Sequence, residues 1–248
     1  MRKPLIAANW KMNLTLQEAK DFANELKKTT FDYKNKDVLI APPSLYLTEM
    51  IKILKKVKLS AQNIHFESTG AFTGEISADM LLSLGVKWTI IGHSERRQLF
   101  GETDEMINKK VLKALDKGLN VILCVGELLN EREAQIEKEI VISQLGLNLN
   151  NIYSEQMKQV VIAYEPVWAI GTGKTAKSED AEEMHKTIRD FIKKKYGRKI
   201  ANNIRILYGG SVKPDNIKEL MSMNNIDGVL VGGASLKFDS FLKIINYN

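Results

Sequence analysis

Glu165 stands at the end of an apolar, β-branched run, where a carboxylate could act as a general base. It closes the run VVIAYE and is followed by PVWAIGTGK. An apolar setting withdraws water from a carboxylate, which raises its pKa toward the range useful for a base. A glutamate that simply reaches solvent at a strand end is the ordinary alternative, and Glu165 taken alone favours that alternative.

A histidine and a lysine occupy comparable places. His93 closes WTIIGH ahead of a short predicted helix, whose N-terminus would disfavour imidazolium and leave a neutral ring to donate to a substrate oxygen. Lys11 follows the apolar IAANW and could stabilise negative charge on a substrate. A structural histidine and a surface lysine are the alternatives. His65, in a predicted loop, and His185, on a predicted polar helix face, are given no chemical role.

Two glycine clusters could cradle an anion. YGGSV at 208–212 ends the seventh apolar run, and VGGASL at 231–236 ends the eighth and opens the last helix. Glycine lets the backbone approach an anion closely, and amides at a helix start point toward it. Either cluster alone also fits a simple turn. Phosphate sites after strands seven and eight recur in (β/α)8 barrels, so the two clusters together predict a phosphate site.

The segment GTGKTA at 171–176 resembles two nucleotide-binding motifs and fits neither. Residues 166–170 separate it from its strand, so the dinucleotide fingerprint fails, and Trp168 stands where a P-loop needs glycine. We interpret the segment as a mobile lid, stiffened at one end by Pro166. Its closure would exclude water and bring a backbone amide to the phosphate.

These residues must be positioned by eight short apolar runs that alternate with amphipathic stretches. The strands are predicted at 5–10, 37–42, 57–62, 88–93, 120–125, 160–165, 204–209 and 227–232. The helices are predicted at 15–28, 103–118 and 178–197, and near 44–56, 77–84, 131–145, 214–223 and 236–246. Leu16 is expected on the buried face of the first helix, and Ser178 is expected to cap the helix at 178–197.

Eight consecutive β/α units in 248 residues predict one (β/α)8 barrel, a single domain over 1–248. An open doubly wound sheet is the competing architecture, and the absence of a surplus strand in the pattern favours closure. In such barrels the site lies at the C-terminal ends of the strands. Asn9, Lys11, His93, Glu165 and Ser211 all fall at such ends.

The composition narrows the class of protein. A net charge of +6 is interpreted first as a lysine-rich solvated surface and second as attraction of an anionic ligand. Nucleic-acid binding comes third, because no helix-turn-helix, zinc or RNA-recognition signature is found. The single cysteine, Cys124, is interpreted as a buried structural thiol, which favours a reducing compartment. The apolar run at 5–8 is too short for a signal peptide or membrane span, so we expect a cytoplasmic protein.

In this order, the motifs resemble those of the triosephosphate isomerases. They are ANWKMN (8–13), GAFTGEIS (70–77), IIGHSERR (90–97), CVGE (124–127), AYEPVWAIGTGK (163–174), ILYGGSVKPDN (206–216) and DGVLVGGASL (227–236). The resemblance spans essentially the whole chain, and it is most specific in AYEPVWAIGTGK together with IGHSERR. Leu128 and Asn130 follow CVGE where the family usually has Thr and Glu. This departure does not affect any residue to which the resemblance assigns a role.

The resemblance implies interconversion of dihydroxyacetone phosphate and glyceraldehyde 3-phosphate, in glycolysis and gluconeogenesis, without a cofactor. No metal is predicted, because no second His or Cys stands at metal-ligand spacing from His93. The resemblance implies that Glu165 is the base and His93 the neutral electrophile. Asn9 and Lys11 would lie at the substrate oxygens. The phosphate would be bound by amides of four residues, namely Gly171, Ser211, Gly232 and Gly233. It also implies a homodimer formed through the long loop around Gly70–Glu75, with Phe72 at its tip and Thr73 near the partner's site.

Two alternatives stay open. One is a different phosphate-binding barrel enzyme, such as an aldolase that forms a Schiff base on a lysine inside a core strand. The interiors of the predicted strands offer only Lys58 and Lys87 nearby, and both stand at strand starts. The other is a barrel that has lost catalysis and only binds, which would lack the base or the electrophile. Both Glu165 and His93 are present.

Overall fold

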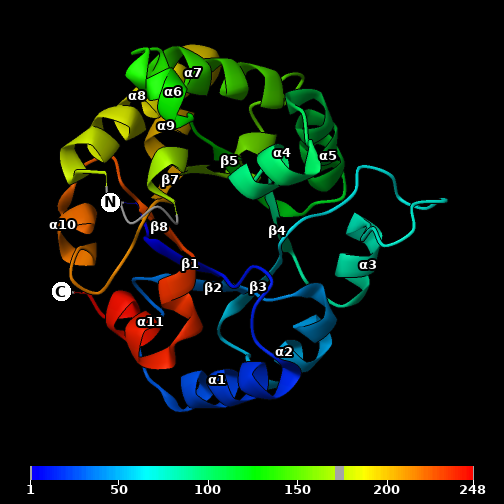
Figure 1. Ribbon diagram of the computed structural model, residues 1–248. Helices are drawn as coiled ribbons and strands as arrows, with labels where there is room; N and C mark the ends of the chain where they lie inside the picture. Colours follow the sequence, from blue (N-terminus) through cyan, green and yellow to red (C-terminus); the bar gives the residue numbers. More distant parts are fainter. Residues whose placement is uncertain (1, 171–175, 248) are drawn as a thin grey trace.

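The eight predicted strand runs form one closed barrel of parallel strands in chain order (Figure 1). The computed structural model describes residues 2–170 and 176–247. Strand β8 returns to β1 with Gly228 opposite Leu5, which excludes the open sheet. The strands are β1 (Leu5–Asn9), β2 (Asp37–Ala41), β3 (Lys58–Ala61), β4 (Trp88–Ile91), β5 (Asn120–Val125), β6 (Val160–Tyr164), β7 (Arg205–Tyr208) and β8 (Gly228–Val231).

A ring of helices surrounds the barrel (Figure 1). The α-helices are α1 (Leu16–Lys28), α2 (Leu47–Ile53), α3 (Ala78–Ser83), α4 (Ser94–Phe100), α5 (Asp104–Asp116), α6 (Leu129–Glu133), α7 (Glu137–Asn148), α8 (Ser178–Tyr196), α9 (Arg198–Asn203), α10 (Ile217–Ser222) and α11 (Phe238–Ile245). The 3-10 turns are η1 (Ser44–Tyr46), η2 (Gln156–Gln159), η3 (Val167–Ala169) and η4 (Gly233–Leu236). The helix predicted at 131–145 is two helices, because Gln135 takes a left-handed conformation (φ 59°) between them.

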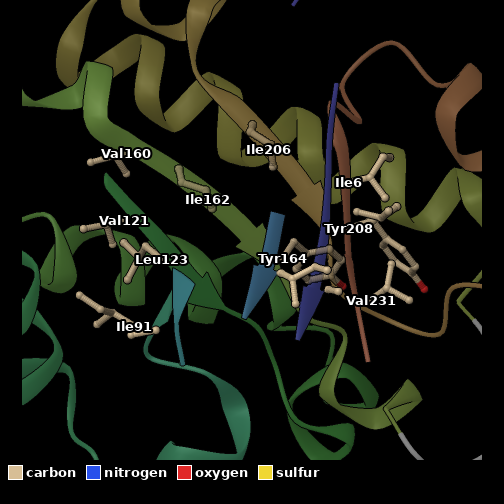
Figure 2. Packing of buried hydrophobic residues seen from close by; sticks show 14 of the residues in the cluster. Ile6, Ile91, Val121, Leu123, Val160, Ile162, Tyr164, Ile206, Tyr208 and Val231 are labelled. Carbon is tan, nitrogen blue, oxygen red and sulfur yellow. The ribbon is translucent and has the colours of Figure 1, made fainter. Parts of the chain in front are cut away.

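Side chains alternate between the inside of the barrel and its outer face. Along β1, Leu5 and Ala7 belong to a small inner cluster, whereas Ile6 and Ala8 pack in the large cluster beneath the helices. Figure 2 shows this outer layer on neighbouring strands, with Leu123 and Ile162 among the labelled side chains. Successive residues of a strand point to opposite faces. Odd-numbered residues of β1 therefore face the barrel axis. Asn9, the next residue in this series, is expected to face the axis as well.

The helix ends show where local signals succeed and fail. Thr15 caps α1 by a capping box with Glu18, and Thr103 caps α5. Ser178 does not cap α8, because it is the first helical residue and its hydroxyl donates to Glu219 instead. The placement of Leu16 was also wrong, since this residue is 42% exposed in the first turn of α1.

His185 is fully buried, which corrects its placement on a polar helix face. It falls in the repeating series of residues that α8 turns toward the barrel, between Ala181 and Ile188. Its ring packs edge-on against Tyr164, with centroids 5.9 Å apart, and Nδ1 lies 3.2 Å from the Asn225 carbonyl oxygen. The histidine therefore helps to dock α8 on β6 and takes no part in the site described below.

Candidate active site

A cavity of about 390 Å³ at the C-terminal end of the barrel gathers the predicted site residues that the structure describes. The residues in its lining come from the ends of five strands or from the loops that follow them, and they are Asn9, Lys11, His93, Glu165, Ser211, Gly232 and Gly233. Gly171, the remaining predicted phosphate ligand, and the rest of the predicted lid up to residue 175 lie outside the described residues.

The alternation of the strands explains why Asn9 and Glu165 face the same space. Asn9 continues the inward series of Leu5 and Ala7 on β1. Glu165 continues the inward series of Val161 and Ala163 and directly follows β6. Because these series line the inside of a closed barrel, their next members converge at its rim.

Glu165 is almost completely buried, with 1% of its surface exposed. One carboxylate oxygen, Oε2, accepts a hydrogen bond of 2.8 Å from the backbone N–H of Ser94. The other, Oε1, lies 3.0 Å from His93 Nε2. Gly209 makes room for this side chain, since a Cβ there would stand 3.0 Å from Glu165 Cγ. Part of the first glycine cluster therefore accommodates the carboxylate.

His93 lies beyond the end of β4, not within it as predicted. Gly92 turns the chain with a left-handed φ of 77°, and His93 is the residue that caps α4. Its Nδ1 accepts a hydrogen bond of 3.2 Å from the backbone N–H of Glu95. A ring nitrogen that accepts cannot carry a proton, so the geometry places the proton of a neutral ring on Nε2, which faces Glu165 and the cavity.

Lys11 has the left-handed backbone conformation (φ 51°) that a lysine rarely adopts. Its N–H donates to Asn9 Oδ1 at 3.1 Å, and its carbonyl accepts from Gln62 Nε2 at 2.9 Å. These two bonds hold the residue in place and direct its half-buried side chain toward the cavity. The Nζ atom pairs with Glu95 Oε1 at 2.7 Å.

Glu95 is a site residue that the sequence reasoning missed. Its carboxylate pairs with Lys11 and its amide binds His93, so it contacts two of the predicted catalytic side chains. It also lines the cavity. The available signal was its position two residues after His93, in the first turn of a helix that starts at a strand end.

The glycine turns after β7 and β8 also line the cavity. Gly232 precedes the 3-10 turn η4, and Gly233 is its first residue, so the second cluster opens this turn and not the last α-helix. A Cβ on Gly232 would lie 3.5 Å from Lys11 Cε, which brings this turn beside the lysine. Backbone amides at such a turn can meet an anion closely.

Lys58 and Cys124, which were also named from the sequence, do not line the cavity. Lys58 begins β3 at the other end of the barrel and pairs with Asp37 at 2.9 Å. Cys124 is buried inside the barrel, as predicted. Within the described ranges, no three His, Cys, Asp or Glu side chains gather closely enough to hold a metal ion. The same residues include no helix long and apolar enough to cross a membrane.

The connection between β3 and α3 projects from the barrel (Figure 1). Phe72, near its tip, is 42% exposed and packs against His65 with ring centroids 4.3 Å apart. Gly70 lies directly against the Phe72 ring, since a Cβ there would come within 2.7 Å of the ring carbon Cε2. The loop is thus internally packed while one aromatic surface faces outward.

A closed (β/α)8 barrel with a buried carboxylate, an imidazole and an ammonium group at its C-terminal rim defines a barrel enzyme built for acid–base chemistry. Comparison with known proteins identifies the family. Residues 4–248 match the family model described as triosephosphate isomerase, and the chain belongs to this family.

Relatives from bacteria match over nearly the full length. Triosephosphate isomerase of Alkaliphilus metalliredigens is 53% identical, with all of both chains covered. That of Carboxydothermus hydrogenoformans is also 53% identical, over 99% of this chain and 98% of its own. That of Lactobacillus delbrueckii subsp. lactis is 51% identical, over 99% and 98% respectively. The similarity therefore includes every strand and every rim loop.

Proposed function

We propose that this protein is a triosephosphate isomerase that interconverts dihydroxyacetone phosphate and D-glyceraldehyde 3-phosphate. Family membership across residues 4–248 supports this activity. One structural observation carries the chemistry: the buried Glu165 carboxylate lies 3.0 Å from His93 Nε2 in a cavity that also contains Lys11 and two glycine turns. The whole chain, 1–248, is proposed to act as one domain.

In the proposed reaction, Glu165 removes a proton from the carbon next to the carbonyl group and returns it to the neighbouring carbon. The electron pair of the broken C–H bond forms a C=C bond while the π pair of the carbonyl group moves onto its oxygen, which gives an enediolate. His93 donates from Nε2 to that oxygen and helps exchange the proton between the two oxygens. The positive charge of Lys11 stabilises the negative oxygen, and Asn9 binds beside it.

The phosphate group would lie against the turns after β7 and β8. The backbone amides proposed to bind it belong to Ser211, Gly232 and Gly233, with Gly171 added from the lid. A phosphate group held at a fixed distance from the reacting carbons supplies binding energy that orients the substrate. The net charge of +6 adds a general attraction for the anionic substrate.

The proposed assembly is a homodimer formed through the loop around Gly70–Glu75. The partly exposed Phe72 supports this proposal, because an ordered aromatic side chain on a projecting loop is suited to docking. Sedimentation that gives a monomer at micromolar concentration would contradict it. The cytoplasm is the proposed location, supported by the single, buried and free Cys124.

A coupled assay with glyceraldehyde 3-phosphate tests the activity directly. The purified chain is expected to form dihydroxyacetone phosphate without added cofactor. The aldolase alternative is tested in parallel by borohydride reduction in the presence of the carbonyl substrate. Covalent trapping of substrate on a lysine, together with no isomerisation, would replace the isomerase by a Schiff-base enzyme.

A further inference from the structure

The segment after β7 forms one wall of the cavity and is held by a side chain outside that wall. Ser211, Val212 and Lys213 line the cavity, whereas Asn216 is not part of the lining. Asn216 is half-buried and stands immediately before α10. Asn216 therefore lies behind the wall and does not face the cavity.

Both ends of the Asn216 amide bind the backbone of the wall. The Nδ2 atom donates a hydrogen bond of 2.9 Å to the carbonyl oxygen of Ser211. The Oδ1 atom accepts a hydrogen bond of 2.8 Å from the backbone N–H of Lys213. One side chain thus holds the peptide groups on both sides of Val212.

The side chain of Asn216 is not used to cap the helix. Thr15 and Thr103, at the starts of α1 and α5, accept hydrogen bonds from amides of the following turn. Asn216 occupies the equivalent place before α10 but makes no such bond. Its backbone N–H instead donates to the Lys213 carbonyl at 3.2 Å. The donor and the acceptor of the side chain both serve the preceding turn.

Holding these peptide groups determines which way the wall presents its amides. A peptide unit is planar, so the fixed Ser211 carbonyl and Lys213 N–H hold the two peptide units that follow Ser211. This restrains Ser211, whose own N–H is proposed to bind the phosphate. Without Asn216 the wall would have to be ordered again each time an anion binds, and this ordering weakens binding.

We propose that Asn216 is a positioning residue that keeps the Ser211 wall in the conformation that binds the phosphate group of the substrate. This inference rests on the proposed function, because it assigns the anion at this wall to the substrate's phosphate. Asn216 acts through Ser211 and Lys213 and is not assigned a contact with the reacting atoms.

Two substitutions distinguish the two hydrogen bonds that the Asn216 amide makes. Asn216→Ala removes both hydrogen bonds. Asn216→Asp keeps an acceptor for the Lys213 N–H, but it loses the donor to Ser211 and places a carboxylate against that carbonyl oxygen. Neither change removes a helix cap, since none is made, so both variants are expected to fold. Asn203→Ala is the matched control, because its amide donates only to the Lys199 carbonyl within α9.

The test compares a phosphate-dependent readout with a phosphate-independent one. Inorganic phosphate binding is measured by titration calorimetry, and turnover is measured with glyceraldehyde 3-phosphate and with unphosphorylated D-glyceraldehyde. Asn216→Ala is expected to weaken phosphate binding and raise KM for the phosphorylated substrate by about five- to tenfold, the loss typical of one or two hydrogen bonds. Asn216→Asp is expected to lose more, whereas D-glyceraldehyde turnover and the control variant stay unchanged.

The proposal is overturned if phosphate binding by Asn216→Ala equals that of the unmodified protein, or if turnover of D-glyceraldehyde falls in parallel. A comparable loss in Asn203→Ala would overturn it as well. Calorimetry needs no isomerisation, so a protein that binds phosphate through this wall but does not isomerise would refute the proposed function alone. A protein that isomerises equally well with and without Asn216 would refute only this inference.

Discussion

The backbone N–H of Ser94 donates a hydrogen bond of 2.8 Å to the carboxylate of Glu165, joining groups 71 positions apart in the sequence. Ser94 begins α4 directly after His93, whose Nε2 lies 3.0 Å from the other carboxylate oxygen. The loop after β4 therefore orients the proposed base with one backbone amide and one imidazole.

Replacing Glu165 by glutamine should abolish most activity while leaving the fold intact. The glutamine oxygen can still accept from the Ser94 N–H, but an amide cannot take up a proton from carbon. We expect kcat to fall by at least about 10³-fold, near the range for loss of a general base, with an unchanged melting temperature. Glu133→Gln, an exposed position in α6, is the control. Retention of most of the turnover would refute the role of Glu165.

Replacing Lys11 by methionine should lower kcat/KM by roughly 10²- to 10³-fold, because it removes the one proposed positive charge at the reacting oxygens. The apolar stem and the strained backbone are preserved, so the protein should still fold. The matched control is Lys109→Met, which breaks a lysine–glutamate pair of the same 2.7 Å length with Glu105 on the surface of α5. Equal effects of the two substitutions on steady-state kinetics would contradict the assignment.

Adding one methyl group at Gly209 should disturb the base without touching it chemically. The new Cβ would stand 3.0 Å from Glu165 Cγ and 3.2 Å from the Tyr164 carbonyl oxygen, so the carboxylate must shift. We expect Gly209→Ala to lower kcat by about 10- to 100-fold, as misplacement of a catalytic group does. Gly146→Ala in α7 meets no atom within 4 Å and should keep full activity. A normal kcat in Gly209→Ala would contradict this prediction, because it would show that Glu165 keeps its working position beside a Cβ.

Asp37 should make the stability of the protein depend on acid pH. Burial by itself would raise the pKa of this carboxyl group, but hydrogen bonds from Lys58, Lys3 and Arg205 lower it from the ordinary 3.8 to about 2. A pKa that is lower in the folded state means that the stabilisation is present above about pH 4. It is lost as the pH falls toward 2.

The difference between 3.8 and about 2, at about 1.4 kcal/mol per pKa unit, corresponds to roughly 2.5 kcal/mol at neutral pH. Urea unfolding at pH 7 should show Asp37→Asn to be less stable by about that amount, and the gap should narrow at pH 3. Asp116→Asn, at an exposed position, provides the comparison and should change little. A gap that stayed constant with pH would show that lost packing, not charge, is responsible.

Cys124 should be inert in the folded protein. Its side chain lies inside the barrel with no exposed surface, and burial raises the pKa of the thiol well above its ordinary range, with Glu165 adding to the effect. The thiolate is the reactive form, so a thiol–disulfide reagent at pH 8 should react at least on the order of 10²-fold faster after denaturation. Rapid reaction of the native protein would indicate that the barrel opens frequently.

The fold and most of the site could be predicted from the chain alone, because their signals are local. Each strand is a short apolar run, and eight such runs alternate with helical stretches. A barrel brings all C-terminal strand ends to one rim, so Asn9, His93 and Glu165 could be assigned to one site before any distance was known.

Other features depend on how the elements are packed. Leu16 has a helical apolar spacing but lies in an exposed first turn, whereas His185 has a polar ring that is buried where α8 meets β6. Residue type and periodicity do not determine how far a neighbouring element covers a given position. Only the packed structure decides that.

The sequence by itself determined which residue types stand at the strand ends, and hence the kind of chemistry available. The tertiary structure decided which of their neighbours complete the site. Glu95 reaches Lys11, Ser94 reaches Glu165, and Asn216 binds the backbone on both sides of Val212. The physical reason is that such contacts depend on loop directions and on distances across the barrel rim, neither of which is set by the spacing of residues along a strand or helix.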